Sequence, residues 1–152
     1  MELSLENFKK LLLQRELHPE IQRETQQVFA MMPIEGRDYP LFVRIFEESG
    51  LVQCIAFFPF EIKKQTFPDV ARLLHLFNKE LDIPGFGLDE ESKVLFFRCM
   101  IPSNKGKIEE DLFLAYLNTI HLACSSFTKP IEAVAAGAAT FEELIEKVNK
   151  NQ

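Results

Sequence analysis

Polar and apolar residues follow two different periods along this chain, and the points where the period changes divide it into elements. In residues 3–16 the apolar positions recur every three to four residues, which is typical of an amphipathic helix. These positions are Leu5, Phe8, Leu11 and Leu12. Pro19 interrupts the pattern, because a proline disfavours helical backbone at the residue before it, here His18.

Between residues 25 and 60 the period falls to two, the spacing of a β-strand whose two faces have different surroundings. We expect three strands, at 25–32, 39–48 and 51–60, joined by turns at EGRD (35–38) and SG (49–50). The second strand shows the alternation best, with Tyr39, Leu41, Val43 and Ile45 set against Phe42, Arg44 and Phe46. This pattern predicts an antiparallel meander with one apolar face and a second, partly apolar face.

A helix start follows these strands. Thr66 as N-cap, Pro68 in the first turn and Asp69 form a combination typical of helix N-termini. The helical spacing then returns at Val70, Leu73, Leu74, Phe77 and Leu81, so we expect this helix to cover the sheet. It ends at DIPGFG (82–87), where a proline and two glycines prevent continuation.

The remaining third predicts two strands and two helices. The strands, at 85–89 and 93–102, flank a turn at DEES (89–92). A third helix begins after the SNKGK loop (103–107), and Pro130 is expected to kink or break it. Its buried stripe comprises Ile108, Leu112, Leu117, Ile120, Cys124 and Phe127.

A last helix follows the small-residue stretch at 133–139. Thr140 and Glu143 form a capping box, and the apolar face is Phe141, Leu144, Ile145 and Val148. The complete order is α-β-β-β-α-β-β-α-α, an α+β fold in which helices pack on an antiparallel sheet of about five strands. We expect residues 1–152 to form a single domain.

Composition and charge limit the classes of partner. The net charge is −6, which argues against nucleic acid and anionic membrane surfaces, since both attract Lys and Arg. No apolar run approaches the ~20 residues of a membrane helix, and the N-terminus lacks the pattern of a signal peptide. The three cysteines include no CxxC pair, which indicates reduced thiols. We therefore expect a cytoplasmic protein that binds neither nucleic acid nor membrane.

Candidate catalytic groups are sparse. His18, His75 and His121 are isolated along the chain, and Cys54, Cys99 and Cys124 lie in apolar contexts without basic neighbours. The GFG of 85–87 lacks the further glycine of a dinucleotide loop. Asp89, Glu90 and Glu91 could serve an enzyme together with His75 only if the four converged in one pocket. We expect no enzymatic activity, no cofactor and no metal.

Phenylalanine is the unusual feature, with 15 residues and no tryptophan. If the strands alternate, the phenylalanines at 42, 46, 57, 58, 60, 96 and 97 cannot all face one core. Either helices cover both faces of the sheet, or part of this surface binds another polypeptide. The residues expected to bind a partner are Phe42, Phe46, Phe57, Phe58, Phe60 and Phe97.

From about residue 39 to 146 the chain resembles the bacterial YbjN family. The similar features are FPF (58–60), the helix VARLLHLFNKEL (70–81), the hairpin and strand GFGLDEESKVLFFRCMIP (85–102), the long C-terminal helix, AAG (135–137) and TFEELIEK (140–147). The resemblance implies the fold of type III secretion chaperones, which are small, acidic, cytoplasmic and often homodimeric. It also implies a non-catalytic protein, either a regulator of signalling or a chaperone-like adaptor, and it carries over no catalytic residues.

Two functions follow from this reasoning. The first is a chaperone-like, homodimeric module that holds a segment of a partner protein, with a secreted effector as one candidate partner. The alternative is a sensory or stress regulatory adaptor of the YbjN type that holds no client chain.

Overall fold

The computed structural model describes residues 1–151, which form an α+β fold with one antiparallel sheet. The six strands run in the spatial order β1-β2-β3-β4-β6-β5, and every neighbouring pair is antiparallel. The strands are β1 (Glu20–Gln22), β2 (Gln27–Ile34), β3 (Arg37–Phe46), β4 (Leu51–Phe57), β5 (Phe86–Asp89) and β6 (Val94–Pro102). The four α-helices are α1 (Leu5–Gln14), α2 (Phe67–Glu80), α3 (Glu110–Ala135) and α4 (Phe141–Lys150).

The predicted fold class and element order are confirmed, with one addition. The sheet has six strands because the short β1 pairs with the start of β2, in a segment where no strand was predicted. A strand of three residues is too short to show a period of two, so the sequence pattern could not reveal it. The strand predicted at 25–32 is β2, which begins and ends two residues later.

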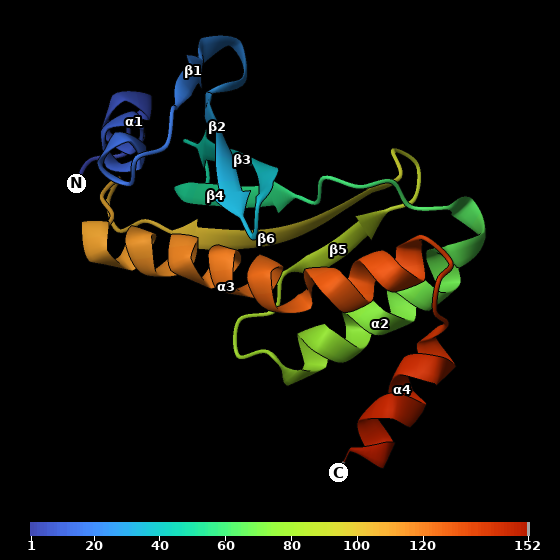
Figure 1. Cartoon of the computed structure of the whole chain (residues 1–152). Coiled ribbons are helices and arrows are strands. Elements are labelled where there is room, and N and C mark those ends of the chain that lie inside the picture. Colours follow the sequence, from blue (N-terminus) through green and yellow to red (C-terminus); the bar gives the residue numbers. More distant parts are fainter. Residues whose placement is uncertain (152) are drawn as a thin grey trace.

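The core lies between the sheet and the helices. Alternate residues of the strands point toward the helices and are buried, as the alternation in β3 predicted. Figure 1 shows α2 and α3 side by side beneath the sheet, while α4 projects away from the body. At the other end α1 packs on the start of α3, where the rings of Phe8 and Phe113 lie 4.9 Å apart. The buried residues of α1, α2 and α3 all join one hydrophobic cluster with these strand residues.

Three details of the helices differ from the predictions. Leu112, expected in the buried stripe of α3, is 43% exposed. Thr66 does not cap α2 with its side chain; it closes a 3-10 turn (Lys64–Thr66), and its hydroxyl donates to the carbonyl oxygens of Lys63 and Ala135. Of the kink or break expected at Pro130, the break is wrong, since α3 continues through Pro130 to Ala135. The flanking residues Thr128 and Ile131 are buried against the core, and this packing holds the helix together where the proline removes a hydrogen bond.

The GFG segment is explained by close packing of β5 on β6. A Cβ atom at Gly85 would overlap the Arg98 carbonyl oxygen, and one at Gly87 would overlap the ring of Phe96. Gly85, just before β5, therefore allows a close approach to the β6 backbone, and Gly87 allows a close approach to a large β6 side chain.

Candidate protein-binding face

The face of the sheet that points away from the helices is rich in aromatic side chains. We call this surface the open face, and its central residues are Phe29, Phe42, Arg44, Phe46, Ile55, Phe57, Phe96, Arg98 and Met100. None of these residues belongs to the hydrophobic core cluster or to the partly buried residues packed against that cluster. Among residues 1–151, no helix therefore covers the centre of this face.

Strand register brings the open-face phenylalanines into one row. Phe29 is directly opposite Phe42, and Phe57 is directly opposite Phe96. The ring centroids are 5.0 Å apart between Phe29 and Phe42, 5.8 Å between Phe42 and Phe57, and 6.2 Å between Phe57 and Phe96. Each ring is half-buried, because its neighbours in the row cover its sides. The result is a continuous aromatic strip across four strands.

Ile55 lies in the middle of this strip. It is in register with Phe42 on one side and Arg98 on the other. Only 8% of its surface is exposed, although it lies outside the core cluster. The open-face side chains themselves therefore shield it, and the strip has a small hydrophobic centre of its own.

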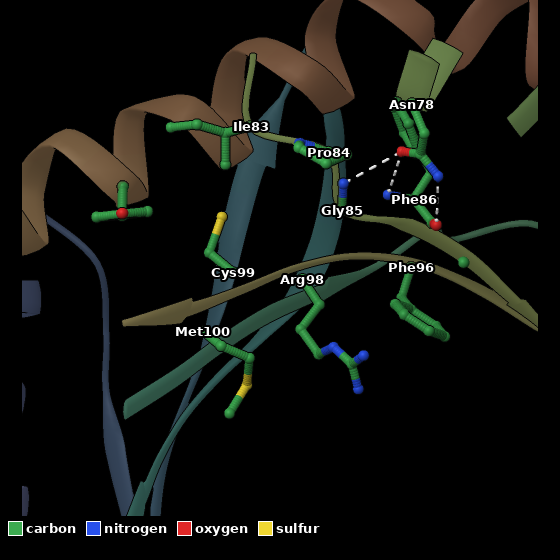
Figure 2. Close-up of a pocket in the computed structure, with 11 residues that line it drawn as sticks. Asn78, Ile83, Pro84, Gly85, Phe86, Phe96, Arg98, Cys99 and Met100 are labelled. Atoms are coloured by element: carbon green, nitrogen blue, oxygen red, sulfur yellow. Dashed lines mark hydrogen bonds between the residues drawn. The ribbon is translucent and has the colours of Figure 1, made fainter. Parts of the chain in front are cut away.

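Two arginines project from the same face. The guanidinium carbon of Arg44 lies 4.8 Å from the ring centroid of Phe46, and that of Arg98 lies 5.7 Å from the centroid of Phe96. Figure 2 shows Phe96, Arg98 and Met100 pointing to one side of β6, while Cys99 points to the other. Neither arginine is in the four ion pairs found in residues 1–151, which are Arg23–Glu6, Arg37–Glu132, Arg72–Glu142 and Lys79–Glu80.

The acidic cluster at 89–91 borders the open face at the β5–β6 turn. Together with Phe57, Phe96 and Arg98 it lines a shallow groove of about 720 Å³. Asp89 accepts hydrogen bonds from the backbone N–H of Glu91 at 3.1 Å and of Ser92 at 3.4 Å. The bonds from Ser92 are the main reason why the pKa of Asp89 lies below its usual value. This carboxylate thus stabilises the turn, and His75, exposed on α2, is not among the residues that line the groove.

A second groove, of about 500 Å³, lies at the edge of the sheet where β5 begins (Figure 2). Asn78 of α2 fixes its wall. Its side-chain oxygen accepts from the backbone N–H of Gly85 at 3.1 Å and of Phe86 at 2.9 Å, and its amide donates to the Phe86 carbonyl at 2.9 Å. β5 pairs with β6 only as far as Phe97, so no strand within residues 1–151 pairs with the outer edge of β6 from Met100 onward.

The structure separates the six phenylalanines expected to bind a partner. Phe42, Phe46 and Phe57 lie on the open face. Phe97 is fully buried in the core, and Phe58 is 7% exposed with its ring packed on Tyr39 and Phe86. Phe60 is half-buried beneath the guanidinium of Arg37. These last three belong to the helix-covered side. Phe97 alternates with the open-face residues Phe96 and Arg98 of β6, and Phe58 and Phe60 lie past the end of β4 at Phe57, where the alternation no longer applies.

Six open-face residues were not among those expected to bind a partner: Phe29, Arg44, Ile55, Phe96, Arg98 and Met100. The signal for two of them was present in the sequence. An arginine between apolar neighbours, as in FVRIF (42–46) and FFRCM (96–100), marks the solvent-facing set of alternate strand residues. Phe96 shares this parity with Arg98, whereas Phe97 has the opposite parity.

The three cysteines are buried in the core and unpaired. Cys54 and Cys99 are direct cross-strand neighbours, a proximity that the sequence did not suggest. Desolvation raises the pKa of Cys99 to about 11 and that of Cys124 to about 12, and it raises the pKa of Cys54 further still. Buried thiols with raised pKa values are poor nucleophiles and poor metal ligands.

Within the described part of the chain, no three His, Cys, Asp or Glu side chains gather in a way that could hold a metal ion. His18, His75 and His121 are all exposed. None of the helices in residues 1–151 is both long and apolar enough to span a membrane.

These features define a one-sided α+β domain, with a helix-covered core on one face of its sheet and an aromatic strip on the other. The chain belongs to the YbjN family. The family model described as "Putative bacterial sensory transduction regulator" matches residues 4–133. The match begins at α1, earlier than the resemblance at 39–146, and it stops before α4. None of the curated proteins compared with the chain matches it.

Proposed function

We propose that this protein is a non-catalytic adaptor that binds another protein through the open face. The observation that carries the proposal is the row of half-exposed phenylalanine rings across β2, β3, β4 and β6, with no helix of residues 1–151 covering it. Contiguous apolar patches of this kind on a domain surface mark sites of protein interaction. Aromatic rings supply large contact area with little loss of conformational freedom.

In its chaperone-like form, the protein would hold a segment of a partner, such as a secreted effector, across the strip, and it would act as a homodimer. The type III secretion chaperone fold that the resemblance to the YbjN family implies supports this form. In the alternative form, the protein is a regulatory adaptor that binds a folded signalling protein and holds no client chain. The description of the matching family supports the alternative.

Photo-cross-linking tests the proposal. Benzoylphenylalanine incorporated at position 57 should form adducts with the partner in cells, whereas the same group at the exposed position 13 on α1 should not. With the identified partner purified, Phe57→Thr should weaken binding by at least about tenfold. A partner that binds the Phe42→Thr/Phe57→Thr variant as tightly as the parent protein would overturn the proposal.

The same partner distinguishes the two forms. A synthetic peptide that covers the cross-linked region should retain the affinity if the protein holds an extended segment, and it should lose the affinity if a folded surface is recognised. Sedimentation velocity tests the homodimer, which should have twice the 17.6 kDa mass of one chain.

A further inference from the structure

We propose that the open face selects an acidic amphipathic segment, one that carries carboxylates between its apolar side chains. This inference rests on the proposed function and specifies the chemistry of the partner. It starts from Arg44 and Arg98, two exposed cations among the otherwise uncharged central residues of the open face, on a protein whose net charge is −6.

The arginines occupy the centre of the face rather than its rim. Arg44 is directly opposite Gln27 on β2 and Gln53 on β4, and Arg98 is directly opposite Ile55. All three cross-strand neighbours are uncharged. The two arginines therefore flank β4, one on each side, and each lies two residues along its strand from a ring of the strip, Arg44 from Phe42 and Arg98 from Phe96. A segment laid across the strip therefore lies beside both guanidinium groups.

Covering an arginine without a partner is costly, because a charge removed from water needs compensating hydrogen bonds. The protein itself supplies no carboxylate within salt-bridge distance of either arginine among residues 1–151. The rings of Phe46 and Phe96 stabilise the cations only in part. The partner must therefore provide the acceptors, and carboxylates form the strongest bonds to guanidinium.

The acidic residues of the protein determine how such a segment would run. Glu47 and Glu48 lie beside the β3–β4 turn, Asp89, Glu90 and Glu91 lie in the β5–β6 turn, and Glu20 on β1 is directly opposite Phe29 at one end of the strip. A segment along the strands would place its carboxylates near these acids. A segment across β2, β3, β4 and β6 meets acids only at its two ends, at Glu20 beside Phe29 and at the β5–β6 turn beside Phe96, so its own carboxylates belong near its centre. It needs to span only about 14 Å, which a helix of about 12 residues exceeds.

Two matched synthetic peptides test this inference. Both carry the same Leu and Phe positions on a helix of about 14 residues, and they differ only in having Glu or Lys between them. In fluorescence anisotropy, the Glu peptide should bind at least about tenfold more tightly than the Lys peptide. The preference should disappear in Arg44→Gln/Arg98→Gln, reverse in Arg98→Glu, and persist in the matched control Arg15→Gln, an exposed arginine at the end of α1.

The outcomes separate this inference from the proposed function. Equal binding of the two peptides, abolished by Phe57→Thr, would overturn acidic selection and leave protein binding at the open face intact. Binding that depends on both arginines but is indifferent to Phe57→Thr would support the electrostatic selection and overturn the aromatic strip as the binding surface. Failure of both peptides to bind would overturn the inference.

Two other occupants of the open face, a nucleic acid and a second copy of this chain, are tested with the same variants. A single-stranded oligonucleotide that binds more tightly than the Glu peptide, through the same two arginines, would overturn the inference. So would a dimer that Arg98→Gln dissociates and that blocks the Glu peptide, because the occupant would then be a second copy. Circular dichroism should show that every variant folds, since both arginine side chains are exposed.

Discussion

Asn78 illustrates how much of a local structure can depend on one side chain. It lies near the end of α2, and its amide makes three hydrogen bonds to the backbone of Gly85 and Phe86. Two N–H groups and one carbonyl at the start of β5 would lose their partners without it. Because Phe86 packs on Phe77, Phe97 and Phe127, these bonds also fix the position of a core ring.

We expect Asn78→Ala to lower the free energy of unfolding by about 2–3 kcal/mol, since it leaves up to three partly buried backbone groups unsatisfied. Asn78→Asp should cost less, because it keeps the acceptor for the two N–H groups. Asn118→Ala is the control, at an exposed position on α3, and should change stability by less than about 0.5 kcal/mol. Urea denaturation measures all three. A loss for Asn78→Ala no larger than that of the control would contradict this assignment.

The buried thiols give the protein a characteristic dependence on pH. Their folded-state pKa values lie above the ordinary value of 9.0, so the folded state retains protons that the unfolded state releases. This contribution to stability is fully present below pH 9 and is lost as the pH rises from about 9 through the folded-state pKa values. Over this pH range, each thiol should lower the free energy of unfolding by up to about 1.4 kcal/mol for every unit by which the pH rises.

Urea midpoints at about pH 8 and pH 10, in the presence of a reductant, measure this loss. Lysine and tyrosine also titrate in this range, so the informative quantity is the difference between proteins. Cys54→Ala should lose less stability between the two pH values than the parent protein, because one thiol fewer titrates on unfolding. Equal losses in the two proteins would show that Cys54 does not contribute.

At the scale of elements, a buried polar chain joins β3 to α3. The hydroxyl groups of Tyr39 and Thr128 lie 2.5 Å apart, and that of Thr128 donates to the Cys124 carbonyl one helical turn earlier. Both residues are buried, and burial is the main reason why the pKa of Tyr39 is raised. Each buried hydroxyl group in this series of hydrogen bonds has its partner only while both side chains are present.

We expect Thr128→Val to lower the free energy of unfolding by about 1–3 kcal/mol, because the Tyr39 hydroxyl would be left buried without its partner. Tyr39→Phe should cost about 1 kcal/mol, since Thr128 keeps its bond to Cys124. The double variant should be more stable than the sum of the two losses predicts, and urea denaturation of all four proteins in the cycle measures this coupling. Additive losses would mean that the two hydroxyl groups do not depend on each other.

Most elements could be predicted because their periodicity is strong. The local exceptions could not be predicted. The alternation in β3 and the stripe in α2 depend on which residues face the core, and the sequence shows this directly. The role of Thr66 and the continuity of α3 at Pro130 depend on contacts with distant residues, such as the Ala135 carbonyl that Thr66 bonds. Local sequence rules cannot register such contacts.

At the scale of the whole molecule, the sequence left one question open: whether helices cover both faces of the sheet. The sequence showed that the strands hold more phenylalanines than one core face can take. It did not show which of them lie on the open face and which lie in the core. Phe96 and Phe97 are adjacent and identical, yet one lies on the open face and the other in the core. The placement of α1, α2 and α3 on one side decides this, and it follows from tertiary packing rather than from any single segment.

The two faces should therefore respond differently to the loss of a ring. Phe97→Ala should cost about 3–5 kcal/mol, because it opens a cavity in a fully buried site. Phe57→Thr should cost less than about 2 kcal/mol, since its ring is half-exposed and packs only within the open-face row. It should also reduce the fluorescence of a bound apolar dye, because it interrupts the strip. Leu13→Thr, at an exposed leucine on α1, should leave the dye signal unchanged. If Phe57→Thr destabilised the protein as much as Phe97→Ala, the open-face rings would be needed to stabilise the fold. Their position on the open face would then no longer support a binding surface.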